Sequence, residues 1–198
     1  MKPFPIVLIT GASSGIGKSI GIYLTQKGCK VYGTSRNAEN YKEFKSFSLL
    51  SLDVSKPETI QAAVDHIIKK SGRIDVLINN AGIGITGPLE ETPLSEIDHC
   101  FNTNFKGPIR VIQSVLPSMR NSKEGLIINI TSIAGAMGLP FRGIYSASKA
   151  ALSLVTESYN LELKKFGIKC CSLAPGDFAT NIAAGRFHVK SDIASPYH

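Results

Sequence analysis

The feature that most constrains the fold is an apolar run that leads directly into a glycine-rich segment. Residues 5–10 are continuously apolar, as expected of a parallel β-strand buried on both faces. The run ends in Thr-Gly-Ala-Ser-Ser-Gly-Ile-Gly at residues 10–17, and a helical pattern continues to Lys27. Strand, tight turn and helix in this order predict the first unit of an α/β fold.

The rest of the chain repeats this alternation of strand and helix. Strands joined by helices of this length imply right-handed crossovers and a parallel sheet covered on both faces. We therefore predict a doubly wound α/β fold that forms one domain over residues 1–198. The further strands are predicted at residues 30–34, 47–52, 75–79, 126–131 and 168–174.

Capping patterns mark the ends of three helices. Gly28 stands where a C-terminal cap belongs. Ser55 and Glu58 have the spacing of a capping box. Thr92 followed by Pro93 is typical of an N-cap and a first helical residue.

The composition excludes several classes of protein. The net charge is +7, but the basic residues are scattered without aromatic interleaving, which suits an anionic small molecule better than a nucleic acid. The cysteines form no CxxC pair, so we expect core thiols and no metal site, with Cys170 and Cys171 on opposite faces of a strand. No apolar stretch is long enough to span a membrane, and a cytoplasmic protein is expected.

The glycine-rich segment is suited to the phosphates of a nucleotide. Gly11 permits a tight turn, Gly15 lets the backbone approach a pyrophosphate, and Gly17 lets helix and strand pack closely. The N–H groups and partial positive charge of the helix N-terminus also favour phosphate. The spacing G-x-x-x-G-x-G is a variant of the dinucleotide fingerprint.

The same segment also fits the nucleophile elbow of a hydrolase. Residues 11–15 match G-x-S-x-G, which would make Ser13 the nucleophile. Such an enzyme needs a later histidine, but two histidines fall on helical patterns and two lie in a terminal stretch without a strand. The sequence therefore favours nucleotide binding over hydrolysis. The histidines are His66, His99, His188 and His198.

Tyr145 and Lys149 have the spacing of an acid/base pair. Residues four apart lie on one face of a helix. An ammonium close to a phenol stabilises the phenolate, so the tyrosine pKa should fall below about 10. Such a tyrosine can exchange a proton with an alcohol or carbonyl. The spacing alone equally fits two unrelated surface residues.

Taken together, the motifs resemble those of the classical short-chain dehydrogenase/reductases along nearly the whole chain. They follow successive strands, so all would face the crevice at the strand C-termini. The resemblance implies a Rossmann fold and a metal-free oxidoreductase that transfers a hydride between a nicotinamide cofactor and a carbonyl or secondary alcohol. The matching residues are 10–17, Asp53-Val54, Asn79-Asn-Ala-Gly82, Asn104, Ser132, Tyr145, Lys149 and Pro175-Gly176.

The resemblance implies a role for each of four catalytic residues. Tyr145 would protonate the carbonyl oxygen, or deprotonate the alcohol in reverse. Lys149 would lower the tyrosine pKa and bind the nicotinamide ribose. Ser132 would donate to the substrate oxygen, and Asn104 would bind a water that links Lys149 to solvent as a proton relay.

A cofactor-binding set follows from the same resemblance. Asp53 would accept a hydrogen bond from the adenine amino group, with Val54 beside the ring, whereas Asn79 would be structural and pin neighbouring strands. The remaining set comprises the glycine turn, the adenine-ribose segment, the nicotinamide segment and the acid/base pair. These are Gly11, Ser13, Ser14, Gly15, Ile16, Gly17, Asn80, Ala81, Gly82, Pro175, Gly176, Phe178, Thr180, Tyr145 and Lys149.

Arg36 indicates NADP(H) rather than NAD(H). A site for NAD(H) places an acidic residue just past the second strand, but no acid follows here until Glu39. The Arg36 guanidinium could pair with a 2′-phosphate and stack on adenine, and Lys18 could add positive charge. An NAD(H)-dependent alcohol dehydrogenase is the alternative.

The chain stops at His198, where members of the family usually continue through a seventh strand and a final helix. We expect residues 183–198 to begin an incomplete substrate-covering segment. A non-catalytic nucleotide-binding or scaffold protein is therefore an alternative, against which the intact catalytic set argues. By family analogy, we expect a homodimer or homotetramer with a small-molecule carbonyl or alcohol substrate.

Overall fold

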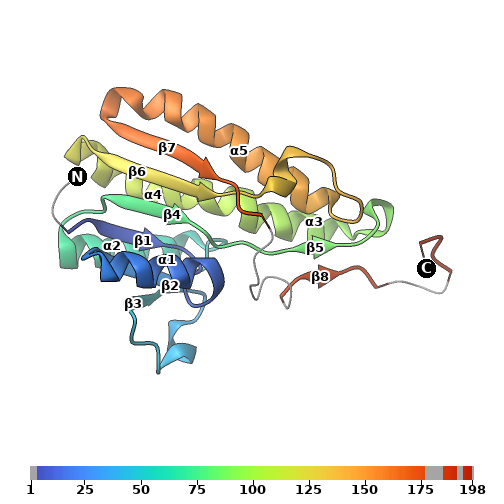
Figure 1. The fold of residues 1–198 in the computed structure, drawn as a ribbon, viewed down its shortest axis with the longest axis horizontal. Coiled ribbons are helices and arrows are strands. Elements are labelled where there is room, and N and C mark those ends of the chain that lie inside the picture. Colours follow the sequence, from blue (N-terminus) through green and yellow to red (C-terminus); the bar gives the residue numbers. More distant parts are fainter. Residues whose placement is uncertain (1–3, 177–184, 191–193, 198) are drawn as a thin grey trace.

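Six parallel strands form the central sheet of the protein. The computed structural model describes residues 4–176, 185–190 and 194–197. The strands lie in the order β3-β2-β1-β4-β6-β7 (Figure 1), so the prediction of a doubly wound parallel sheet is confirmed. The strands are β1 (Ile6–Ile9), β2 (Lys30–Ser35), β3 (Ser48–Ser51), β4 (Val76–Asn79), β6 (Gly125–Ile130) and β7 (Ile168–Leu173).

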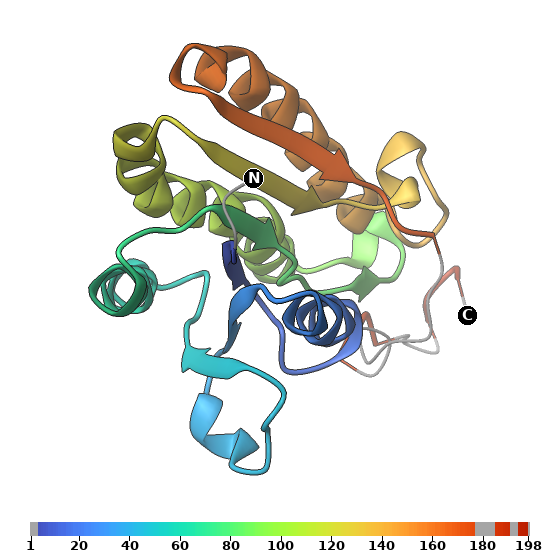
Figure 2. The same ribbon diagram turned by 60° about the vertical axis from the view of Figure 1, so that its left-hand side comes forward.

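Helices cover both faces of the sheet (Figure 2). Helices α2, α4 and α5 pack on one face and α1 packs on the other. The α-helices are α1 (Gly15–Gln26), α2 (Pro57–Ser71), α3 (Leu94–Phe101), α4 (Gly107–Ser122) and α5 (Gly143–Leu163). Shorter helical turns are η1 (Ala38–Tyr41), η2 (Leu89–Glu91), η3 (Asn102–Lys106), η4 (Ile133–Ala136) and η5 (Lys164–Phe166).

Strand β1 lies inside the sheet because both of its faces are apolar. Leu8 belongs to the core under α2, α4 and α5, together with Leu77 and Ile127. Ile9 belongs to the core under α1, together with Ile78. The continuous apolar run at the N-terminus is therefore accounted for by burial on both sides.

Helix α2 does not begin with the predicted capping box. It starts at Pro57, and Lys56 is the N-cap residue without a side-chain cap. The Ser55 hydroxyl instead donates to Asp53 Oδ1 at 2.7 Å. The helix begins one residue later than the pattern requires, and the Ser55 hydroxyl faces Asp53 and not the first N–H groups of the helix.

Thr92 does not cap α3 either, whereas Gly28 ends α1 as predicted. The Thr92 hydroxyl donates to the Pro88 carbonyl at 2.7 Å and closes η2, and Pro93 occupies the N-cap position. Gly28 has a φ of +83°, and its N–H donates to the Thr25 carbonyl at 3.0 Å. The prediction for Gly28 depended only on the left-handed backbone conformation that ends a helix, which glycine adopts more readily than other residues.

A buried polar chain joins the centre of the sheet to α5. Asn79 Nδ2 donates to Asn129 Oδ1 at 2.9 Å, and Asn129 Nδ2 donates to Thr156 Oγ1 at 2.8 Å. All three side chains are buried. Asn79 thus pins β4 to β6, which is the structural role expected for it.

A two-stranded parallel ribbon lies beyond the C-terminal end of β4 (Figure 1). It pairs β5 (Ile85–Thr86) with β8 (Phe187–His188), and the Phe187 N–H donates to the Gly84 carbonyl at 3.0 Å. The ribbon was not predicted, because two-residue strands carry no periodic signal. It holds residues 185–190 against the loop that follows β4.

Other sequence expectations can be compared with the described residues. Cys170 is buried and Cys171 is exposed on β7, so their placement on opposite faces is confirmed. Within the described ranges, no group of three or more potential metal ligands of the His, Cys, Asp and Glu types comes together. No helix among these residues is long and apolar enough to cross a bilayer.

The polar chain generates a stability prediction. Thr156→Val keeps the side-chain shape but leaves the buried Asn129 amide without its acceptor. We expect the free energy of unfolding, measured by urea denaturation, to fall by about 1–3 kcal/mol. Ser158→Ala removes an exposed hydroxyl from the same helix and should change it by less than about 0.5 kcal/mol. Equal losses in the two variants would contradict a special role for the chain.

Candidate functional site

A cavity of about 840 Å³ lies at the C-terminal ends of the strands, with walls that follow β1, β2, β3, β4, β6 and β7. This is the side of a doubly wound sheet on which ligands bind. Phe178 and Thr180 lie outside the described residues. The predicted site residues that line the cavity are Gly11, Ser13, Ser14, Gly15, Ile16, Arg36, Asp53, Val54, Asn80, Ala81, Gly82, Ser132, Tyr145, Lys149, Pro175 and Gly176.

The glycine turn is packed tightly against the loop after β4. Gly11 has a φ of +64°, and a Cβ there would lie 2.9 Å from Ala81 Cα. Gly17 lies behind the turn, where a Cβ would meet the Asn80 amide and come 2.7 Å from the Gly11 carbonyl oxygen. Both positions therefore exclude a side chain, and the turn keeps its backbone free to face the cavity.

The Asn80 side chain faces the turn and not the expected ribose position. Its Nδ2 donates to the carbonyls of Thr10 and Gly11 at 3.0 and 2.9 Å. In return, Thr10 Oγ1 accepts from the N–H groups of Asn80 and Ala81, each at 3.0 Å. The side chain of Asn80 is thus used to shape the turn.

Asp53 and Arg36 occupy the cavity end next to β2 and β3. Burial raises the pKa of the Asp53 carboxyl, but hydrogen bonds from Ser55 and the charges of Lys56 and Arg36 outweigh it, so the pKa is lowered. Arg36 is exposed on the cavity wall. Lys18 does not line the cavity, because its ammonium lies over the Phe44 ring at 5.5 Å.

Tyr145 and Ser132 meet at the opposite end of the cavity. Tyr145 lies in the first turn of α5, and Ser132 is the N-cap of η4. The pKa of Tyr145 is raised because burial outweighs the hydrogen bond from Ser132 and the charges of Arg186 and Arg142, which lower it. The expected lowering of this pKa by Lys149 is therefore wrong for this arrangement.

Lys149, the other member of the pair, is buried as well. Its side chain is 4% exposed, and Nζ donates to the Ile130 carbonyl at 2.8 Å. Nζ lies 5.9 Å from the centroid of the Tyr145 ring. Burial lowers the pKa of Lys149 to about 8. The two groups share one helix face, but each loses solvation there.

Asn104 lies in a buried π-helical turn behind the cavity wall. Its Oδ1 accepts from the Ile83 N–H and its Nδ2 donates to the Ile83 carbonyl, both at 2.9 Å. Nδ2 also lies 3.2 Å from Ser148 Oγ. The amide thus ties this turn to the backbone of Ile83, and Asn104 itself is not among the residues that line the cavity. π-helical turns are frequent at functional sites.

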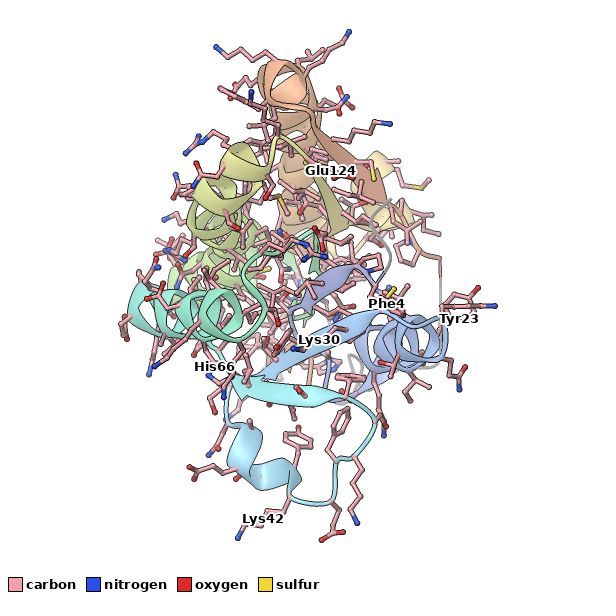
Figure 3. The ribbon with its side chains drawn as sticks, turned by 90° about the vertical axis from the view of Figure 1, so that its left-hand side faces the viewer. Phe4, Tyr23, Lys30, Lys42, His66 and Glu124 are labelled. Carbon is pink, nitrogen blue, oxygen red and sulfur yellow. The ribbon has the colours of Figure 1, made fainter. Side chains whose placement is uncertain are left out.

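The hydrolase interpretation gains no support from the geometry. Among the described residues, no histidine forms a hydrogen bond with Ser13. His66 on α2 packs edge-on against Tyr32 (Figure 3), with ring centroids 6.5 Å apart. His188 lies on β8. His99 lines the cavity, but it comes from α3 and not from a strand end.

Sequence reasoning missed part of the cavity wall. Tyr41 comes from η1, and Leu139 and Arg142 come from the loop before α5. Gly84 and Arg186 meet where β5 and β8 pair. For this part of the wall, the sequence offered one signal: Arg142 is a basic residue that lies about one helical turn before Tyr145.

Comparisons with known proteins agree with this geometry. A family model described as short chain dehydrogenase matches residues 5–190. The 3-ketodihydrosphingosine reductase of Bacteroides thetaiotaomicron is 47% identical over 187 residues, covering 94% of this chain and 68% of the relative. Retinol dehydrogenase 8 of Bos taurus is 34% identical over 186 residues, covering 88% of this chain and 59% of the relative.

Solved structures share the same fold. A short-chain dehydrogenase from Streptomyces avermitilis has a TM-score of 0.89 at 34% identity, covering 96% of this chain and 74% of its own. ElxO with NADP bound has a TM-score of 0.86 at 33% identity, with 92% and 79% covered. A 3-ketoacyl-(acyl-carrier-protein) reductase from Brucella melitensis complexed with NADH has a TM-score of 0.87 at 26% identity, with the same coverage.

The family match extends over both the glycine turn and the segment that carries Tyr145 and Lys149. The chain therefore belongs to the short-chain dehydrogenase family of oxidoreductases.

Proposed function

We propose that this protein transfers a hydride between NADP(H) and a carbonyl or secondary alcohol, with Tyr145 as the proton donor and acceptor. The observation that supports this most is the meeting of Tyr145 and Ser132 at one end of a cavity whose other end is the glycine turn. The names of two relatives, a keto-group reductase and a retinol dehydrogenase, describe chemistry of this kind.

The residues present fit a dinucleotide. The turn at Gly11 and Gly15 has positive φ at both glycines and opens onto the N-terminus of α1, which favours phosphate. Gly82 continues the cradle, because a Cβ there would lie 3.2 Å from Asn104 Oδ1 and 3.5 Å from Lys149 Nζ. When bound, NADP(H) supplies or accepts the hydride.

Tyr145 and Ser132 have different roles at the substrate oxygen: Tyr145 transfers a proton and Ser132 donates a hydrogen bond. In reduction, the Tyr145 phenol gives its proton to the carbonyl oxygen as that oxygen gains the electron pair of its double bond. Ser132 Oγ accepts from the Ala134 N–H at 3.2 Å. Its own proton, which interacts with Tyr145 when no substrate is bound, can then donate to the substrate oxygen. A raised pKa keeps the proton on the phenol until the oxygen becomes basic, which suits a general acid.

Lys149 stabilises the phenolate that this step produces. Its ammonium, held by the Ile130 carbonyl, lies on the same helix face as the phenol. With a pKa of about 8, the amine carries its charge at neutral pH and can also give up a proton. Reprotonation of Tyr145 through Lys149 and a water held by Asn104 would complete the cycle.

Substitution of the tyrosine tests the proposal. We expect Tyr145→Phe to lower kcat/KM for carbonyl reduction by about 10²–10⁴-fold, because the proton donor is lost, with NADPH affinity retained. NADPH absorbance follows turnover and NADPH fluorescence follows binding. Tyr23→Phe, on the outer face of α1 (Figure 3), is the matched control. Equal rates for the two variants would remove the acid/base role, and tight NADPH binding without turnover by the unsubstituted protein would favour a non-catalytic nucleotide-binding protein.

Cofactor choice is tested at Arg36. If its guanidinium pairs with the 2′-phosphate, Arg36→Ala should raise the Kd for NADPH by about tenfold or more, with little change for NADH. Lys45→Ala removes the same charge from an exposed position outside the cavity wall and should affect neither. An equal effect of Arg36→Ala on both nucleotides would refute the 2′-phosphate role of Arg36.

The buried amine predicts a pH dependence of stability. The pKa of Lys149 falls from 10.5 to about 8 on folding, so the unfolded chain binds more protons between these values and stability rises with pH across this window. Relative to Lys149→Met, the unfolding free energy of the unsubstituted protein should therefore rise by about 2.5 kcal/mol between pH 7 and pH 10. Urea denaturation at both pH values measures it. Lys70→Met, at the exposed end of α2, should show no such change, and a constant difference for Lys149→Met would contradict the lowered pKa.

A further inference from the structure

The cavity end at Tyr145 carries positive charge that no carboxylate of the described lining residues balances. Arg142 and Arg186 both line this end. Among the described cavity-lining residues, Asp53 has the only carboxylate, and it lies at the other end within the influence of Arg36. The two ends of the cavity therefore differ in electrostatic character.

Both arginines are close enough to Tyr145 to act on it. Arg142 directly precedes α5, one helical turn before Tyr145. Arg186 comes from the segment that pairs with β5, and a Cβ on Gly84 would lie 3.0 Å from its Nε. Burial raises the pKa of Tyr145 and the charges of the two arginines lower it, which places both charges at the reacting end.

The backbone fixes the position of each arginine. The Arg142 N–H donates to the Leu139 carbonyl at 3.1 Å, and the Arg142 carbonyl accepts from the Ser146 N–H at 2.9 Å. Arg186 precedes Phe187, whose N–H pairs with the Gly84 carbonyl in the β5–β8 ribbon. The backbone at both positions is therefore fixed, which keeps the two arginines at the cavity.

Neither guanidinium has a partner in the described part of the chain, although both residues are half-buried. The other half-buried arginines are satisfied. Arg73 pairs with Asp75 at 2.9 Å, and Arg110 donates to Asn102 Oδ1 at 2.7 Å. A partly desolvated charge without a partner is costly, so it is retained where a ligand supplies the partner.

We infer that the substrate of this protein carries an oxyanion group, such as a carboxylate, which Arg142 and Arg186 bind while Ser132 and Tyr145 hold the reacting oxygen. The inference rests on the proposed function and deepens it. A guanidinium presents paired N–H donors that match the two oxygens of such a group. The reacting carbonyl and the anion would then be fixed at two points, which orients the carbonyl for proton transfer.

Matched acids and esters test this substrate class. Reduction of 4-oxopentanoate, 5-oxohexanoate and 6-oxoheptanoate with NADPH is compared with that of their methyl esters, which have the same ketone without the charge. We expect at least one acid to be preferred over its ester. Arg142→Gln and Arg186→Gln should each lower that acid-to-ester ratio of kcat/KM about tenfold, mainly through KM, equivalent to about 1.4 kcal/mol.

Two controls separate this role from others. Lys69→Gln removes an equal charge from the exposed end of α2 and should leave the acid-to-ester ratio unchanged. The Kd for NADPH should also be unchanged in both arginine variants. If NADPH affinity falls instead of the ratio, the arginines serve the cofactor and the inference is wrong. An equal loss of kcat/KM for acid and ester would mean that the two arginines act on Tyr145 alone, and the inference would be wrong.

A binding experiment keeps the inference separate from the proposed function. Hexanoate and hexanamide cannot be reduced, so their affinities for the NADPH-bound protein, measured by calorimetry, do not depend on catalysis. Tighter binding of hexanoate, lost in Arg142→Gln and Arg186→Gln, supports the oxyanion site even if no ketone is reduced. Reduction of the esters without preferential hexanoate binding would leave the oxidoreductase proposal intact and overturn the anionic substrate.

Discussion

The hydrogen bonds between Thr10 and the start of the loop after β4 are the interaction on which the site depends. Thr10 Oγ1 accepts from the N–H groups of Asn80 and Ala81, and the Asn80 amide returns bonds to the carbonyls of Thr10 and Gly11. β1 and β4 are neighbours, yet the chain leaves them in opposite directions, toward β2 and toward β6. A crevice must open at this switch point. The Thr10 bonds fix its two walls, so the glycine turn and the loop that reaches Gly82 keep one separation.

How far the fold and the site could be predicted from the sequence depends on whether a feature follows from local patterns or from contacts between distant segments. The sheet, the turn at Gly11 and the bridge from Asn79 follow from local patterns and strand order, so the sequence was sufficient for them. The caps predicted at Ser55 and Thr92 were wrong because each helix begins one residue later, and the two hydroxyls interact with groups that precede the helices. Arg186 could not be placed, because its position depends on a ribbon between segments far apart in the chain.

The proton-transfer end shows why spacing alone misled. A spacing of four positions between the phenol and the amine predicts that the ammonium stabilises the phenolate, if only their charges are considered. In the folded protein both groups are withdrawn from solvent, and desolvation is the largest cause of the pKa shift of each. The result is a phenol that keeps its proton and an amine that releases one more readily. These are the properties of a general acid with a nearby proton source, so the same burial that contradicts the expected pKa direction of Tyr145 is consistent with its proposed role.

Arg142 and Arg186 would link the charge of the substrate to the protonation state of Tyr145. Their positive charges lower the pKa of Tyr145 against the effect of burial. An oxyanion bound between Arg142 and Arg186 would cancel part of that field, so the phenol would hold its proton more firmly once the substrate is in place. A phenol that is more fully protonated is the form required for reduction. An anionic ketone would therefore promote the protonation state that its own reduction needs, whereas a neutral ketone would leave the arginine charges uncompensated.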